Sequence, residues 1–254
     1  MIQNTVVLDK HALKGPVPDP VTSVAEGMVL CMNKPLGWTS ADVVRKVRFL
    51  LQRRWLLKRI KVGHAGTLDP LATGLLIICV GKATQLANYF QEQEKEYVAE
   101  IMFGATTPSH DLEHPIDFTY PWEHIDFTRL EKTLDGFLGE QQQMPPVFSA
   151  KIIDGTRAYE LARQGNTPQM KEHTICIRSL KIVAYAPPRL TLKINCSKGT
   201  YIRSLARDLG EALESGAHLV SLHRSKSGPY TADDAMSIED FEVFIRNETK
   251  NTTV

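Results

Sequence analysis

The stretch GHAGTLDPLATGLL, residues 63 to 76, decides how the rest of this sequence is interpreted. It holds three glycines, one proline and a single acidic residue, Asp69. Pro70 keeps Asp69 in an extended backbone conformation, and the glycines allow tight turns and the close approach of a large ligand. Two interpretations are open: Asp69 shapes the turn before Pro70, or it is a nucleophile kept ionised by a distant Arg or Lys.

Two other kinds of site fit the sequence poorly. A phosphate-binding P-loop needs four residues between its glycines and a Ser or Thr after the lysine, whereas six residues separate Gly74 from Gly81, and Ala83 follows the lysine. The histidines of HDLEH (110–114) would share a helix face and hold a metal, but prolines at 108 and 115 leave no room for that helix. We expect an exposed polar turn there and no metal site.

The charge of the chain is nearly balanced overall but unevenly distributed. The net charge is +1 over 254 residues. Residues 34–61 carry nine bases and one acid, 92–140 twelve acids and three bases, and 171–207 eight bases and one acid, which gives +8, −9 and +7. Two basic blocks around an acidic one suggest a surface that binds a polyanion.

The four cysteines, at positions 31, 79, 176 and 196, form no C-x-x-C pair and lie in or beside apolar runs. We expect reduced, buried thiols and a cytoplasmic protein. The N-terminus lacks the pattern of a secretory signal, and the longest aliphatic run, 75–80, is too short to span a membrane.

The order of expected elements favours an α+β fold with a mixed, mainly antiparallel sheet. Residues 1–27 are predicted to be an extended arm that packs loosely. A helix is capped by Thr39 or Ser40, and its apolar residues at 43, 44, 47, 50 and 51 share one face. The other expected strands are 28–35, 74–81, 97–103, 174–186, 189–197 and 218–230, and the other helices are 83–92, 129–138, 201–214 and 237–245, with a strand, turn and helix in 147–165.

A partner for Asp69 is available in CSKGTYIRSLARDLG, residues 196–210. Here Thr200 is expected to cap a helix that carries Tyr201 and Arg203 in its first turn. A cation at a helix N-terminus opposes the helix dipole, so an anion beside Arg203 would explain its position, and Asp69 is one candidate.

These blocks together resemble the TruB family of tRNA pseudouridine-55 synthases. GHAGTLDPLATGLL is similar to the catalytic loop of that family, and further blocks match in the same order between about residues 28 and 241: NKPLGWTS (33–40), EKEYVAEI (94–101), PPVFSAKIIDGTRAYELARQG (145–165), CSKGTYIRSLARDLG and GAHLVSLHR (216–224).

The resemblance implies an α+β catalytic domain with a long mixed, mainly antiparallel sheet, flanking helices and an RNA-binding cleft. It implies isomerisation of uridine to pseudouridine at position 55, in the T-loop of tRNA, without cofactor or metal. By matching position, Asp69 would be the nucleophile, Arg203 its partner, and Tyr97 a residue that stacks on the base and acts in proton transfer. The remaining residues implied to bind substrate are His64, inserted into the T-loop, Tyr201 and Leu222 in the uridine pocket, and Lys198.

The expected partner is therefore the T-arm of tRNA, with no membrane or protein partner, and a monomer is expected. We divide the chain into an N-terminal arm (1–27), a catalytic domain (28–245) and a tail (246–254), and we expect no C-terminal PUA domain. Asn33 stands where the family usually has Asp. The segment QRRWLLKRIK (52–61) is longer and more basic than the family pattern, and we hypothesise that it contacts RNA.

Two alternatives stay open at this point. The chain could be a tRNA-binding or folding chaperone with secondary catalysis, because both activities would use one cleft. It could also be a carboxylate-based glycosidase acting on free nucleosides, but that chemistry needs a second acid, and 63–76 contains only Asp69.

Overall fold

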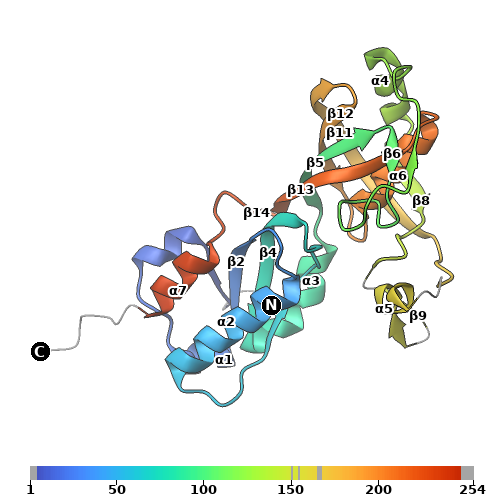
Figure 1. Cartoon of the computed structure of the whole chain (residues 1–254). Coiled ribbons are helices and arrows are strands. Elements are labelled where there is room, and N and C mark those ends of the chain that lie inside the picture. The colour runs from blue at the N-terminus through green and yellow to red at the C-terminus, as the bar shows by residue number, and fades with distance from the viewer. Residues whose placement is uncertain (1–4, 150, 154, 165–167, 247–254) are drawn as a thin grey trace, which may run out of the picture. The chain divides into compact units, whose positions relative to one another are not determined.

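The structure is a computed structural model that describes residues 5–149, 151–153, 155–164 and 168–246. The chain forms two compact units (Figure 1). Unit 1 comprises residues 1–95 and 223–254, and unit 2 comprises residues 96–222. The boundaries fall within two strands, β5 (Lys95–Phe103) and β13 (Ala217–Ser227), so each of these strands contributes residues to both units.

The sheet of unit 1 follows the order β1-β2-β4-β13, with β3 beside β4 and β14 beside β13. β2 pairs with β4, and β3 with β4, in antiparallel fashion, whereas β1 is parallel to β2. The strands not yet delimited are β1 (Val6–Leu8), β2 (Met28–Lys34), β3 (Val62–His64), β4 (Ala72–Val80) and β14 (Tyr230–Thr231). The predicted strands at 28–35 and 74–81 are therefore confirmed.

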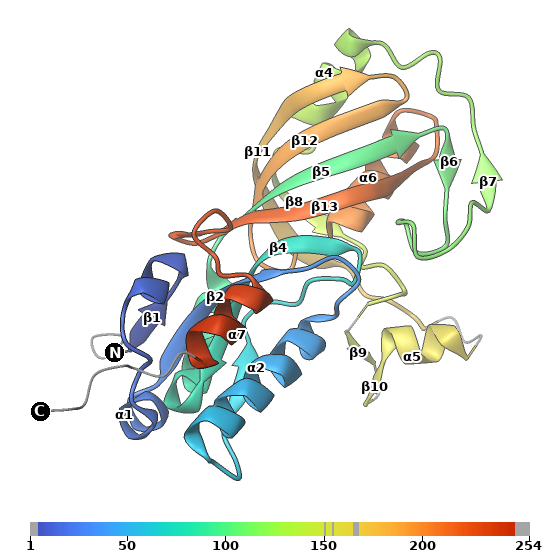
Figure 2. The same ribbon diagram turned by 60° about the vertical axis from the view of Figure 1, so that its left-hand side comes forward.

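Strands β2 and β4 are buried on both faces. Alternate residues, including Cys31 and Ile77, share a core cluster with Phe90 of α3 (Ala87–Glu92), which follows the 3₁₀-helix η2 (Gly81–Leu86). Their neighbours point to the opposite face. There α2 (Ser40–Trp55) packs against α7 (Ile238–Arg246), as Figure 2 shows. This double coverage explains why both strands read as continuous apolar runs.

Helix α2 begins where the sequence predicts it. Thr39 is the N-cap, and its side chain and that of Asp42 form a reciprocal capping box. The five apolar positions predicted to share one face are all buried, at 43, 44, 47, 50 and 51. Leu56, in the left-handed conformation, ends the helix.

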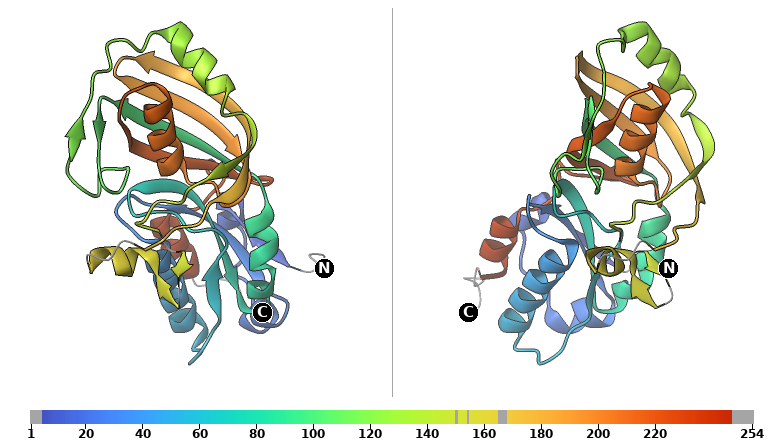
Figure 3. Two further views of the ribbon diagram at one scale, coloured as in Figure 1. Left: turned by 90° about the vertical axis from the view of Figure 1, so that its right-hand side faces the viewer. Right: turned by 45° about the vertical axis from the view of Figure 1, so that its right-hand side comes forward.

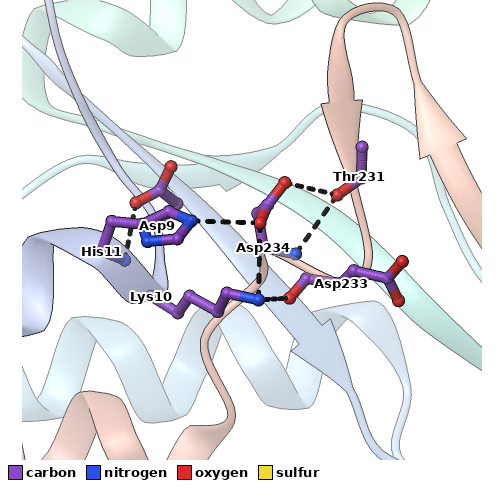
Figure 4. A network of polar contacts seen from close by, with 6 residues as sticks. All are labelled: Asp9, Lys10, His11, Thr231, Asp233 and Asp234. Atoms are coloured by element: carbon purple, nitrogen blue, oxygen red, sulfur yellow. Dashed lines mark hydrogen bonds and ion pairs between the residues drawn. The ribbon is translucent and has the colours of Figure 1, made fainter.

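The N-terminal segment is more ordered than the predicted loosely packed arm. β1 pairs with β2, and two short helices follow, η1 (Lys10–Lys14) and α1 (Pro20–Ala25). Figure 4 shows Asp234 as the anchor of η1: its carboxylate lies 3.1 Å from His11 Nε2 and 3.4 Å from Lys10 Nζ, and it accepts a hydrogen bond from Thr231 Oγ1 at 2.7 Å. The prediction of a loosely packed arm is wrong because the partners of this segment, β2 and Asp234, lie outside it in the sequence.

The sheet of unit 2 follows the order β13-β5-β12-β11-β8. β11 (His173–Ala186) is antiparallel to both β12 (Arg189–Cys196) and β8 (Gly139–Gln143). α4 (Phe127–Asp135) contacts α6 (Ile202–Ala212) and β11, and Figure 3 shows both helices on one side of these strands. The smaller elements are β6 (Ala105–Thr106), β7 (Phe118–Thr119), β9 (Ile152–Ile153), β10 (Thr156–Arg157) and α5 (Ala158–Arg163).

The predicted fold class is confirmed: a mixed, mainly antiparallel sheet with helices packed on it is an α+β arrangement. The expected RNA-binding cleft stays a prediction. Within the described ranges, no helix is both long and apolar enough to cross a membrane.

Candidate active site

Asp69 lies in the loop between β3 and β4, in unit 1, and is partly exposed. The residue before it is fixed to the start of α2, because the Leu68 N–H donates to Ser40 Oγ (2.8 Å) and Ser40 Oγ donates to the Leu68 carbonyl (3.1 Å). The Ala72 N–H donates to the Asp69 carbonyl at 3.1 Å and closes the turn. Of the four leucines around Asp69, three are buried, at 68, 75 and 76, and Leu71 is partly exposed.

A buried lysine supports the loop on the C-terminal side of Asp69, at Pro70. Lys34 ends β2 and is fully buried, and its ammonium group donates to three main-chain carbonyls, those of Trp38 (2.6 Å), Pro35 (3.0 Å) and Pro70 (3.3 Å). Burial lowers the pKa of Lys34 to about 8, while the negative charge of Asp69 acts in the opposite direction. Lys34 is thus still mainly protonated at neutral pH, and its charge acts on Asp69.

A buried arginine joins the two flanks of the same loop. Arg224, on β13, is 1% exposed. Its Nε donates to the Leu75 carbonyl at 2.7 Å and its Nη2 to the Gly66 carbonyl at 3.1 Å. Gly74 lies against the Arg224 main chain, since a Cβ placed on Gly74 would be 2.4 Å from the Arg224 carbonyl oxygen. Arg224 therefore fixes the loop from both its side chain and its backbone.

His64 belongs to the same unit as Asp69. It ends β3, opposite Ile78 of β4, and is partly exposed. Lys34 and Arg224 were not identified as functional from the sequence, although both lie in the blocks NKPLGWTS and GAHLVSLHR that carry the resemblance. Their place in these blocks marks both residues, but a sequence pattern does not show that their side chains bind main-chain carbonyls.

The other predicted site residues lie in unit 2. Arg203 is in the first turn of α6 and 3% exposed. It donates to the carbonyls of Phe148 (2.9 Å) and Ser109 (3.2 Å), and its Nε lies 3.6 Å from Asp111 Oδ2. Since Asp69 and Arg203 belong to different units, their pairing stays a prediction.

The buried carboxylate of Asp111 corrects the interpretation of HDLEH. The segment is not helical, as expected, but Asp111 is 4% exposed and lies beside Arg203 rather than in solvent. Burial, with the positive charges of Arg207 and Arg203, lowers the pKa of His110 to about 4. Part of this turn is therefore structural support for Arg203. Within the described ranges, no group of three or more His, Cys, Asp and Glu residues could hold a metal ion.

The start of α6 differs in detail from the prediction. Tyr201 is the N-cap residue, and the expected cap, Thr200, instead donates through its Oγ1 to the Ser197 carbonyl at 3.0 Å. Gln143 of β8 instead holds the N-cap residue itself, because its Oε1 accepts from the Tyr201 N–H (2.8 Å) and its Nε2 donates to the Tyr201 carbonyl (3.1 Å). The start of α6 is therefore fixed by a residue of another element rather than by a local side-chain cap.

The remaining predicted residues occupy distinct environments within unit 2. Tyr97, in β5, and Leu222, in β13, are both 8% exposed. Tyr201 is partly exposed, with its ring edge-on to His173 at 5.9 Å between centroids. Lys198 is exposed in the turn after β12. The structure thus places Asp69 and His64 in unit 1, and these four residues with Arg203 in unit 2.

Comparison with known proteins identifies the family. Residues 53–202 match the model of the TruB family pseudouridylate synthase N-terminal domain, and 203–253 match the tRNA pseudouridylate synthase B C-terminal domain. A relative from Bacteroides fragilis named tRNA pseudouridine synthase B is 53% identical over 220 residues, which cover 87% of this chain and 94% of the relative. One of the same name from Clostridium kluyveri is 44% identical over 83% of this chain and 71% of its own length.

A solved structure supports the fold. The chain resembles one chain of a crystal structure described as a Cbf5-Nop10-Gar1 complex, with a TM-score of 0.66 and 24% identity, over 91% of this chain and 61% of that one. Because the family model covers more than half of the chain and the relatives are about half identical over most of it, the chain belongs to the TruB family of pseudouridylate synthases.

Proposed function

We propose that this pseudouridine synthase acts on tRNA, that its target is the uridine at position 55 in the T-loop, and that Asp69 is its nucleophile. The relatives named tRNA pseudouridine synthase B support the choice of RNA. The observation that carries the role of Asp69 is the loop itself: its single acid is partly exposed, while Lys34 and Arg224 hold the surrounding carbonyls.

The reaction moves a glycosidic bond from nitrogen to carbon without loss of atoms. One route has the Asp69 carboxylate bond to C1′ while the C1′–N1 bond breaks and its electrons stay on the uracil. The ring then turns, C5 bonds to C1′ and displaces the carboxylate, C5 loses its proton, and N1 gains one. The alternative route has Asp69 add to C6 of the base. Both need an ionised carboxylate, which Lys34 favours through its charge.

Unit 2 would supply the groups that recognise the base and the positive charge that pairs with Asp69. Arg203 would pair with Asp69 and orient it, while Tyr97 would stack on the base and act in proton transfer at the sugar. Tyr201 and Leu222 would line the uridine pocket. Extracting the uridine costs a few kcal/mol, and each aromatic stacking contact returns about 1–3 kcal/mol, which suits Tyr97 to this role.

Contacts outside the uridine pocket would select the T-loop. His64 would enter the loop of the RNA, and the exposed Lys198 would contact its phosphates. RNA loops are recognised through splayed bases and backbone shape, so a residue that enters the RNA loop can distinguish its folded shape. We also propose that the protein works as a monomer in the cytoplasm, where buried thiols such as Cys31 stay reduced.

Release of tritium from C5 tests the reaction directly. The full chain is incubated with T-arm RNA that carries tritium at C5 of uridine, and the label released to water is measured over time. Release is expected because C5 loses its hydrogen when it becomes the glycosidic carbon. Replacing the uridine at position 55 by cytidine should abolish it. Release that survives this replacement would contradict the assigned target.

Asp69→Asn separates catalysis from binding. The substitution keeps the size of the side chain but removes the nucleophilic charge, so the rate should fall by more than about 1,000-fold while RNA affinity changes little. Asp117→Asn, at an exposed position in unit 2, is the matched control and should keep the wild-type rate. Equal rates for the Asp69 variant and wild type would exclude Asp69 as nucleophile. A binding or folding chaperone with secondary catalysis would retain its folding effect in the Asp69 variant.

A further inference from the structure

A basic pocket of about 730 Å³ lies in unit 1, away from the loop that carries Asp69. Its polar side chains come from three stretches: Arg48 and Gln52 of α2, Arg59 and Lys61 before β3, and Lys82, Thr84 and Gln85 of η2. Among the described residues that line the pocket, four are cationic and none is acidic. Such a site attracts an anion.

Among the residues that the structure describes, no carboxylate forms an ion pair with any of the four cations of the pocket, at positions 48, 59, 61 and 82. Arg48 Nη2 donates to the Val62 carbonyl at 3.0 Å, but its buried Nε has no partner among the described residues. The guanidinium group of Arg48 thus keeps its positive charge beside the pocket without a carboxylate partner among the described residues.

The pocket is held in shape before any ligand arrives. Gln52 Nε2 donates to the Lys58 carbonyl at 2.9 Å, which ties the end of α2 to the segment that follows it. The Gly81 N–H donates to the Lys61 carbonyl at 2.8 Å, which ties that segment to η2. Cations on a fixed backbone lose less conformational freedom on binding than cations on a flexible tail.

The position of the pocket along β3 connects it to the substrate. Lys61 immediately precedes β3, and His64 ends it, so about 10 Å of extended chain separates the two residues at roughly 3.3 Å per residue. This is far less than one turn of a duplex, about 34 Å. An RNA that reaches His64 therefore needs little further length to bring backbone phosphates to the pocket.

We propose that this pocket binds backbone phosphates of the RNA substrate, beyond the nucleotides that enter the active site. The proposal rests on the proposed function for the identity of the RNA, and it narrows the hypothesis for 52–61. Only part of that segment lines the pocket: Arg59 does, whereas Arg53 and Arg54 are exposed on the last turn of α2, and Arg53 acts electrostatically on Glu242 of α7 instead.

A charge-matched pair of double variants tests the proposal. Arg59→Gln with Lys82→Gln removes two exposed cations from the pocket, and Arg53→Gln with Arg54→Gln removes two exposed cations outside it. Binding of full-length tRNA to each full chain is followed by fluorescence anisotropy between roughly 50 and 200 mM salt. Thermal unfolding of each variant confirms that it is folded.

The pocket variant should bind about tenfold more weakly in the middle of that range, and the magnitude of its slope of log K against log salt should fall by about 1.5, since each lost phosphate contact removes about 0.7–0.9. Under saturating RNA its rate of tritium release should equal that of wild type, because Asp69 is untouched. The control variant should stay within about twofold of wild type, with the wild-type slope.

Equal affinities and slopes for the two double variants would overturn the proposal. So would a pocket that serves a small anion, recognised if millimolar inorganic phosphate raises the unfolding temperature of wild type but not of the pocket variant, while tRNA affinity is the same in both. Failure of the proposed function looks different: wild type would bind tRNA yet release no tritium.

Discussion

Gly74→Ala should destabilise the protein strongly, and the reason lies in one close approach between two strands. Gly74 has φ +98°, and a Cβ there would lie 2.4 Å from the carbonyl oxygen, 2.9 Å from the nitrogen and 3.0 Å from the carbonyl carbon of Arg224. These are main-chain atoms of a paired strand, so no side-chain rotation relieves the contact. β4 or β13 would have to move by several tenths of an ångström or more.

The magnitude follows from two contributions. An L-residue with positive φ costs roughly 1–2 kcal/mol, and overpacking a well-packed region costs roughly 1–3 kcal/mol, so we expect about 2–5 kcal/mol. Gly37→Ala is the matched control, because Gly37 also has positive φ, +80°, but a Cβ there would meet nothing within 4 Å. Its cost should be the conformational part alone, about 1–2 kcal/mol.

Urea unfolding of both variants and wild type at one temperature measures this difference. The midpoints should shift in the order wild type, Gly37→Ala, Gly74→Ala, and the two variants should differ by about 1–3 kcal/mol in the free energy of unfolding. Gly74→Ala should also slow tritium release at temperatures where it is folded, because it displaces the residue that holds both flanks of the Asp69 loop. A difference below about 0.5 kcal/mol between the variants would refute the close approach of Gly74 to Arg224.

Two further perturbations test the buried charges. Asp111→Asn removes the charge of a buried carboxylate that lies 3.6 Å from the Arg203 guanidinium, so the free energy of unfolding should fall by about 3 kcal/mol. Exposed Asp117→Asn should change it by less than about 0.5 kcal/mol in the same urea assay, and equal effects would contradict the pairing of Asp111 with Arg203. The pKa of Lys34 is about 8 in the folded protein, against 10.5 for a lysine in the unfolded chain. Between these two pH values the unfolded chain binds more protons at Lys34 than the folded protein does. The contribution of Lys34 therefore makes the folded state more stable as pH rises from 8 to 10.5, by up to about 3 kcal/mol. Wild type measured against Lys34→Met across that window should show this gain, and a difference that does not vary with pH would refute it.

The parts of the fold that depend on neighbouring residues could be predicted from the sequence. Helix α2 begins at the predicted cap and buries the predicted face because both signals lie within 16 residues. β2 and β4 could be recognised from continuous apolar runs, since strands covered on both faces show no alternation. Periodicity and capping act locally, so the sequence contains them in readable form.

The wrong predictions share a different cause, which is a partner distant in sequence. Thr200 is a plausible local cap, but Tyr201 is the N-cap residue and is held by Gln143, 58 residues before it. Asp111 sits in a polar stretch that resembles a solvent-exposed turn, yet it is buried beside Arg203. No window of neighbouring residues reveals such pairings. For the same reason the basic pocket could only be suspected from the charge of 52–61, since Lys82 completes it from another element.

Lys34 and Arg224, two cations that sequence patterns do not reveal, determine how the loop of the candidate active site is built. Lys34 and Arg224 bind main-chain carbonyls at residues 66, 70 and 75, on both sides of Asp69, and all of these residues belong to unit 1. The shape of the loop is therefore set within unit 1, without Arg203. If Arg203 pairs with Asp69, its part is to orient and ionise the carboxylate rather than to fold the loop. Substitutions of Lys34 or Arg224 should then lower stability and activity together, whereas Arg203→Lys, which keeps the charge, should reduce the rate far more than it changes the packing of the loop.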